Sequence, residues 1–191
     1  MIFVDLLSSG VTHYGMRQVY FFQVLALLEI LHAVIGLVGS NIITTTIQVL
    51  GRLQVLYVHY RVSDARESFG VYPMVLAWTL VELVRYLYLA LKVVKFEPFF
   101  LLWLRYSLFY ALYPLGVYGE MKVLYDALPG IEKASLHAVN LPNAWNASFN
   151  FALYIKIFLI FAYIPGLANQ YLYMINQRRR ALGIFRDPKK D

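Results

Sequence analysis

Residues 19–38 read VYFFQVLALLEILHAVIGLV. Twenty mostly apolar residues are the length that a helix needs to cross the hydrocarbon core of a bilayer. Four further stretches of this kind lie at residues 42–60, 71–94, 99–118 and 149–175. A transmembrane barrel would instead need alternating segments of about ten residues. We therefore predict an all-α fold, a polytopic transmembrane helix bundle of about five spans, as a single domain over residues 1–191 with a basic C-terminal tail at 177–191.

The composition favours a membrane protein and excludes several other classes. The 191 residues are 60% hydrophobic and 15% charged, whereas soluble domains average about 45–50% apolar and about 25% charged. The absence of cysteine excludes disulfides, thiolate metal sites and a cysteine nucleophile. Six basic and two acidic residues in the tail supply +4 of the net charge of +6. A basic end on an apolar chain is typical of the positive-inside rule, and it argues against nucleic acid as a partner.

Charged and polar side chains also lie inside the predicted spans, where they are costly and by default mark function. Every span contributes at least one, and together they predict a polar seam through the bundle. The seam either fixes the helix register by pairing or supports chemistry. Glu29 and His32 match only half of a di-iron site, so we expect no metal centre. The residues of the seam are Glu29, Gln48, Arg52, Glu82, Arg85, Arg105 and Lys156.

The segment YPLGVYGE, residues 113–120, holds the densest group of reactive side chains. Tyr113 and Glu120 lie seven residues apart, so on a regular helix both face the same way at about 10 Å. Pro114 removes a backbone hydrogen bond, and we expect the helix to kink or unwind here. A kink would bring a phenol and a carboxyl to one substrate, but a kinked helix end with an interfacial tyrosine belt fits equally well. Residues 120–128 then predict an interfacial amphipathic helix that ends at Pro129.

Five segments, in order, resemble motifs of the very-long-chain 3-hydroxyacyl-CoA dehydratase family, also called protein-tyrosine-phosphatase-like A proteins. The motif YP-x-G-V-x-x-E is the most specific of them, and the matches run over almost the whole chain. The matching segments are LLEILHAVIGLVGSN (27–41), QVLGRLQVL (48–56), WTLVELVRYLYLAL (78–91), LRYSLFYALYPLGVYGE (104–120) and AYIPGLANQYLYMINQRRR (162–180).

The resemblance implies the removal of water from a long-chain 3-hydroxyacyl-CoA to give a trans-2-enoyl-CoA, a step of fatty-acid elongation in the endoplasmic reticulum membrane. It implies no cofactor and no metal. The family's catalytic tyrosine and glutamate fall on Tyr113 and Glu120. We assign Glu120 as the base at C2 and Tyr113 as the donor to the 3-hydroxyl, with the reverse assignment left open. The supporting residues that the resemblance implies are Arg105, Arg52, Arg85, Gln48, Glu82 and Glu29.

The resemblance also implies a departure from the family pattern. Family members begin with one more span, whereas the match here begins near Met16, so we expect a chain that lacks the first span. An alternative function follows: a dehydratase-like, inactive structural subunit of a larger membrane complex. Elongation enzymes or other membrane subunits would then cover the open face, and an organellar inner membrane is the alternative location.

Overall fold

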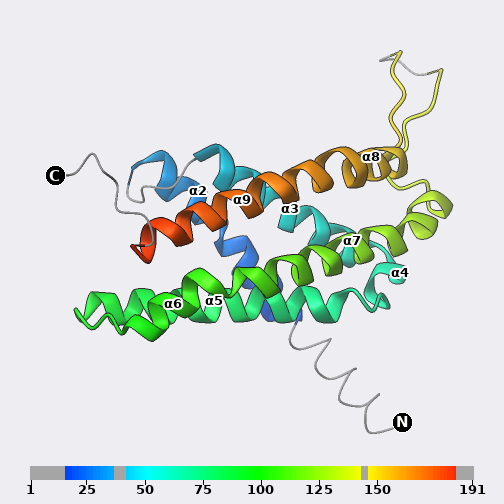
Figure 1. Cartoon of the computed structure of the whole chain (residues 1–191). Helices are drawn as coiled ribbons and strands as arrows, with labels where there is room; N and C mark the ends of the chain where they lie inside the picture. Colours follow the sequence, from blue (N-terminus) through cyan, green and yellow to red (C-terminus); the bar gives the residue numbers. More distant parts are fainter. Residues whose placement is uncertain (1–15, 37–41, 143–145, 184–191) are drawn as a thin grey trace, which may run out of the picture. The chain divides into compact units, whose positions relative to one another are not determined.

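The computed structural model describes residues 16–36, 42–142 and 146–183 (Figure 1). The chain divides into two compact units, residues 1–61 and 62–191. In the described residues the regular structure is helical, apart from one isolated antiparallel bridge between Val139 and Phe149. The all-α prediction is therefore confirmed. Residues 1–15, on which the prediction of a missing first span depends, lie outside the described residues.

The first unit contains a helix at Met16–Val34, whose second part is α2 (Leu27–Val34), and α3 (Ile42–Arg61). A polar contact joins its two helical segments, because the Tyr20 hydroxyl lies 2.6 Å from Nδ1 of the buried His59. A second hydrogen bond runs from the same hydroxyl to the Leu56 carbonyl at 3.4 Å. This tyrosine–histidine pair is not among the predicted functional residues.

The second unit is built around one long helical rod at Phe99–Lys133. The rod consists of α6 (Phe99–Ser107) and α7 (Phe109–Lys133), which meet at a single turn residue, Leu108. Before the rod come the short α4 (Ser63–Arg66) and α5 (Val71–Val93), and after it come α8 (Phe151–Phe158), the π-helical turn η1 (Leu159–Tyr163) and α9 (Ile164–Ala181).

Both α5 and α8–α9 pack antiparallel to this rod, as their contacts show, and Figure 1 shows α5 alongside α7. Residues with higher numbers on α5 contact residues with lower numbers on the rod, and the same is true of α8–α9. On the α5 side the contacts join Gly70 with Gly119, Ala77 with Gly116, and Tyr88 with Arg105. On the α8–α9 side they join Lys156 with Glu132, Tyr163 with Glu120, and Arg178 with Ser107.

The prediction that a helix ends at Pro129 is wrong, and of the two alternatives at Pro114, a kink or unwinding, the unwinding is wrong. The helix does not unwind after Pro114, and Pro129 does not end a separate interfacial helix, because α7 is helical through both prolines to Lys133. An interior proline costs about 3 kcal/mol through its missing N–H and its clash with the preceding turn. The buried face of α7 offsets this cost, since side chains such as Val123, Leu124 and Ile131 are almost fully enclosed.

Three described helices are long and apolar enough to cross a membrane, at Met16–Val34, Val71–Val93 and Phe99–Lys133. A fourth is present if Phe151–Phe161 and Ile164–Ala181, which are bent by 42°, form one broken span. One face of α5 carries the exposed side chains Leu76, Leu80, Leu83 and Leu87. Such an apolar stripe is typical of contact with lipid. The protein is a helical membrane protein.

Candidate active site

Glu120 lies on α7 and is held from two sides. The Trp78 indole N–H of α5 donates to Oε1 at 2.8 Å, and the Tyr163 hydroxyl of η1 donates to Oε2 at 2.8 Å. The carboxyl side chain is half-buried. Each of its two oxygens therefore has a donor from a different helical segment, and these bonds fix the plane of the carboxyl group.

The local sequence explains why Trp78 and Tyr163 reach this position. Trp78 lies on the buried face of α5, and a buried indole N–H needs an acceptor. Tyr163 ends the π-helical turn, two residues before Pro165. A proline cannot donate to the preceding turn and clashes with it, and a π turn is one way in which a helix absorbs this disruption. The wider turn carries the Tyr163 hydroxyl to Glu120.

Tyr113 lies seven residues before Glu120 on the same helix, and its surroundings are different. Its ring is tilted against Tyr171 of α9, with 6.2 Å between the ring centroids. The phenol is near enough to interact electrostatically with Glu120 and with Tyr163. Within the described ranges, no hydrogen bond engages the Tyr113 hydroxyl, and the side chain is half-buried. This hydroxyl is therefore available to a ligand.

The register between α5 and α7 is fixed beside Glu120 by two glycines. A Cβ atom on Gly119 would lie 2.6 Å from both the Gly70 carbonyl oxygen and the Met74 nitrogen. A Cβ atom on Gly70 would in turn lie 2.6 Å from the Gly119 carbonyl oxygen. Small residues at such a crossing let two helix backbones approach closely. In this register Trp78 lies beside Gly116, one turn before Glu120 on α7, and its indole N–H reaches the Glu120 carboxyl.

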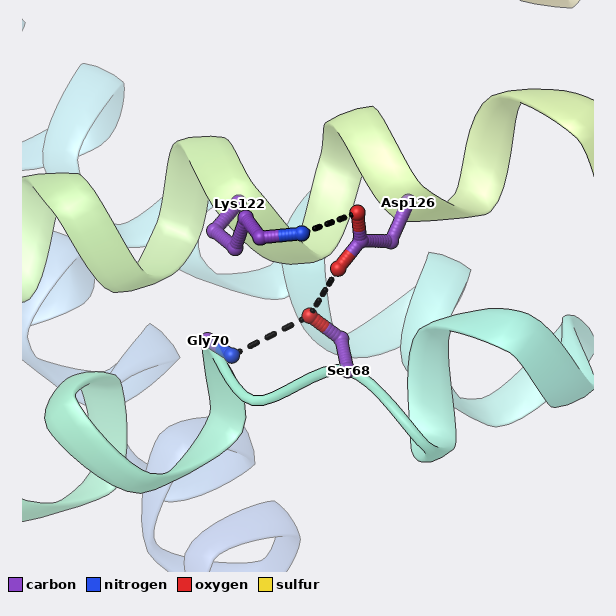
Figure 2. A network of polar contacts seen from close by, with 4 residues as sticks. All are labelled: Ser68, Gly70, Lys122 and Asp126. Carbon is purple, nitrogen blue, oxygen red and sulfur yellow. Dashed lines mark hydrogen bonds and ion pairs between the residues drawn. The ribbon is translucent and has the colours of Figure 1, made fainter.

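A polar network fastens the start of α5 to α7 at the same crossing (Figure 2). The Ser68 hydroxyl donates to one oxygen of Asp126 at 2.7 Å and accepts from the Gly70 N–H at 3.1 Å. Lys122 binds the other Asp126 oxygen. Ser68 thereby satisfies a backbone donor before the first turn of α5 and holds that turn to α7.

The predicted supporting residues of the second unit lie among tyrosines. The Arg105 guanidinium lies over the Tyr88 ring at 4.8 Å and over the Tyr106 ring at 5.4 Å. Arg85 donates from Nη2 to the Tyr86 hydroxyl at 2.9 Å and lies over that ring. Glu82 is half-buried on α5. These contacts place the arginines beside aromatic rings of α5 and α6.

The remaining supporting residues belong to the first unit. Glu29 and Arg52 are half-buried and Gln48 is exposed. Their relation to Glu120 stays a prediction. No group of three or more histidine, aspartate or glutamate residues that could hold a metal ion occurs in the part of the chain that the structure describes.

Sequence reasoning missed the two donors to Glu120. Both lie in segments that carry the family resemblance, but neither was given a role. A signal was present, because an indole or a phenol in an apolar span needs an acceptor and the whole chain has only 11 acidic residues. With so few carboxylates in the chain, each could have been considered as the acceptor for Trp78 or Tyr163.

The described helices define an integral membrane protein in which a carboxyl group, Glu120, is held by two hydrogen bonds. The chain belongs to the family described as protein tyrosine phosphatase-like protein, PTPLA, whose match covers residues 23–184. The chain has no cysteine, so a phosphatase mechanism through a thiolate is excluded despite the family's description.

Three relatives illustrate the similarity. Very-long-chain (3R)-3-hydroxyacyl-CoA dehydratase 2 of Homo sapiens is 39% identical over 175 residues, which cover 91% of this chain and 68% of the relative. The dehydratase hpo-8 of Caenorhabditis elegans is 41% identical over 164 residues, covering 85% and 75%. The dehydratase PASTICCINO 2 of Arabidopsis thaliana is 40% identical over 162 residues, covering 84% and 73%. No solved structure matches the chain.

Proposed function

We propose that this protein dehydrates long-chain 3-hydroxyacyl-CoA to trans-2-enoyl-CoA in fatty-acid elongation, with Tyr113 and Glu120 as the catalytic pair. The observation that carries the proposal is the fixed Glu120 carboxyl, with a 2.8 Å hydrogen bond on each oxygen, two helical turns from the available Tyr113 hydroxyl. The names of the relatives support the same reaction.

Glu120 is the base in this proposal. The C2 proton of a thioester is weakly acidic, so a positioned base must remove it. A carboxylate has about four lone-pair sites, which is more than the two hydrogen bonds from Trp78 and Tyr163 occupy. Trp78 and Tyr163 donate to the charged form and restrict its rotation. The geometry therefore favours Glu120 as base over the reverse assignment.

Tyr113 is the acid. Hydroxide is a poor leaving group, and a proton from the phenol lets the 3-hydroxyl depart as water. The C2–H and C3–O bonds break while the C2–C3 double bond forms. Glu120 then carries the C2 proton and Tyr113 is a phenolate, so one proton transfer from Glu120 to Tyr113, directly or through water, restores both groups.

The finer assignments form part of the same proposal. We propose that α3, which is twenty residues and about 30 Å long, is also a membrane span. Together with the three apolar helices and the bent pair counted as one span, it gives five spans. The supporting roles of Arg105, Arg85, Glu82, Arg52, Gln48 and Glu29 are proposed with it. We place the protein in the endoplasmic reticulum membrane, where elongation enzymes are the expected neighbours.

The test is turnover by the purified full chain in lipid nanodiscs. Wild type should convert 3-hydroxystearoyl-CoA to the enoyl product, followed by mass spectrometry. Glu120→Gln and Tyr113→Phe should each lower kcat by about 100-fold or more, because each removes a proton-transfer group. Tyr118→Phe is the matched control, since this exposed tyrosine lies between them on α7, and it should turn over like wild type.

Two results would contradict the proposal. Wild-type rates in both Glu120→Gln and Tyr113→Phe would remove the site assignment. A folded wild type that converts no 3-hydroxyacyl thioester would remove the activity and favour the inactive structural subunit.

A further inference from the structure

Arg178 lies in the last turn of α9 and is held against the α6–α7 rod. Its Nε donates to the Ser107 hydroxyl at 3.0 Å, and its guanidinium carbon lies 5.5 Å from the centre of the Tyr110 ring. The side chain is half-buried. These contacts use Nε and one face of the group, and within the described residues no hydrogen bond engages the two terminal nitrogens.

An aromatic track connects this arginine to the proposed active site. Tyr171, seven residues before Arg178, contacts Phe109, Tyr110 and Tyr113, with ring centroids 5.5, 6.1 and 6.2 Å apart. Tyr163, eight residues before Tyr171, binds Glu120. Because α9 is antiparallel to α7, the order along the track is Glu120, Tyr113 and then Arg178.

The length of this track can be compared with the chemistry of the substrate. The Arg178 guanidinium contacts Ser107 and Tyr110, which lie six and three residues before Tyr113 on the rod, so it lies about 5–9 Å beyond the level of Tyr113. A substrate whose reacting carbons lie midway between Tyr113 and Glu120 is then about 10–14 Å from the level of this guanidinium. About fifteen bonds separate C2 of a CoA thioester from its first phosphorus, and at about 3.5 Å per three bonds they reach at most about 18 Å, which is enough to span this distance.

We infer that Arg178 binds the phosphates of CoA, with the pantetheine arm along Tyr110 and Tyr171. This inference rests on the proposed function, because it takes the reacting carbons to lie between Tyr113 and Glu120. A planar guanidinium suits bidentate phosphate binding. Arg178 lies at the C-terminal end of α9, where the helix dipole contributes about half a negative charge that would repel a phosphate. The full positive charge of the guanidinium outweighs this repulsion.

The first measurement separates phosphate binding from a merely structural role. The full chain in nanodiscs of phosphatidylcholine is assayed with the same 3-hydroxyacyl group on CoA and on pantetheine, which lacks the nucleotide phosphates. Arg178→Gln should raise KM for the CoA thioester about tenfold, the loss of roughly one charge-assisted contact, with kcat within about twofold. KM for the pantetheine thioester should stay unchanged.

Two controls sharpen the result. Arg180→Gln removes the same charge from an exposed position two residues away and should leave both KM values at the wild-type level. Arg178→Lys keeps the charge without the planar fork and should raise KM for the CoA thioester less than Arg178→Gln does. The absence of anionic lipid separates CoA phosphates from a lipid headgroup as the partner.

The outcomes decide the inference independently of the activity. Equal rises in both KM values, or no rise for the CoA thioester, overturn the phosphate site while the dehydratase function stands. If wild type converts neither thioester, the function fails, and calorimetry with free CoA decides the site. Binding of CoA that Arg178→Gln weakens about tenfold supports the site, whereas unchanged or absent binding overturns it.

Discussion

Glu120 and Tyr113 lie on one helix, two turns apart, and their environments are opposite. Glu120 accepts hydrogen bonds at both oxygens from Trp78 and Tyr163. Tyr113 packs its ring against Tyr171, and its hydroxyl has no hydrogen-bond partner among residues 16–36, 42–142 and 146–183. The structure thus fixes one reactive group and leaves the other open.

The difference matches the demands on an acid–base pair. A base that removes a carbon-bound proton gains from fixed geometry, because small misplacements reduce the rate strongly. An acid that protonates a leaving group has to reach that group on each substrate, so an available hydroxyl is useful. The contrast therefore supports different roles for the two residues.

The two environments also depend on different parts of the fold. The donors to Glu120 come from α5 and η1, so its geometry depends on the register of both segments against α7. The packing of Tyr113 depends on α9 alone among the ring contacts. A change at the α5–α7 crossing should therefore disturb Glu120 first.

Gly119→Ala gives the largest expected effect, because it should disturb the α5–α7 crossing on which the fixed position of Glu120 depends. The new Cβ would lie 2.6 Å from two backbone atoms of the α5 start, and backbone cannot yield as a side-chain end does. Overpacking of this kind costs about 2–3 kcal/mol, and a shift of α5 would draw Trp78 from Glu120. Thermal unfolding in detergent and kcat should both fall.

Gly166→Ala is the matched control for this prediction. A Cβ atom on Gly166 meets nothing within 4 Å among the described residues, and alanine favours a helix over glycine by up to about 1 kcal/mol. This variant should be as stable as wild type or more so. A Gly119→Ala protein with wild-type stability would show that the helices can separate at no cost.

The sequence alone predicted the apolar helices, because they depend on local features, whereas the catalytic pair stays a prediction that rests on the family resemblance. A run of about 20 apolar residues needs no partner to be recognised, and α5 at Val71–Val93 occupies almost the residues of the predicted span. The Tyr113–Glu120 spacing is likewise a property of one helix. These features carry their signal within one segment.

The features that the sequence did not predict depend on packing between segments. Proline and glycine in residues 113–119 favour a broken helix locally, yet α7 is continuous because its buried face packs against α5. The contact between Gly70 and Gly119 joins residues far apart in the chain. The donation from Tyr163 depends on a π turn, for which apolar periodicity gives no signal.

Tyr163→Phe tests whether the fixed geometry of Glu120 matters for the rate. The change removes one hydroxyl and its 2.8 Å bond, while the ring and its packing remain. We expect kcat to fall about tenfold, which corresponds to about 1.4 kcal/mol, because Glu120 gains freedom to rotate. Tyr125→Phe, an exposed position on α7, is the control. An unchanged or higher kcat would show that this donor does not position the base.

Tyr113→Phe gives the smallest expected effect on stability. Comparing it with Glu120→Gln tests directly whether the fold engages only one of the two groups. Its hydroxyl has no partner in the described chain, so removing it should change the free energy of unfolding by less than about 0.5 kcal/mol. Glu120→Gln should cost more, about 1–3 kcal/mol, because two hydrogen bonds to a carboxylate are replaced by weaker bonds to a neutral amide. Melting curves of the two variants in the same detergent make the comparison. A Tyr113→Phe protein that melts as early as Glu120→Gln would mean that the phenol is engaged within the fold, and the acid would then have no available proton to give.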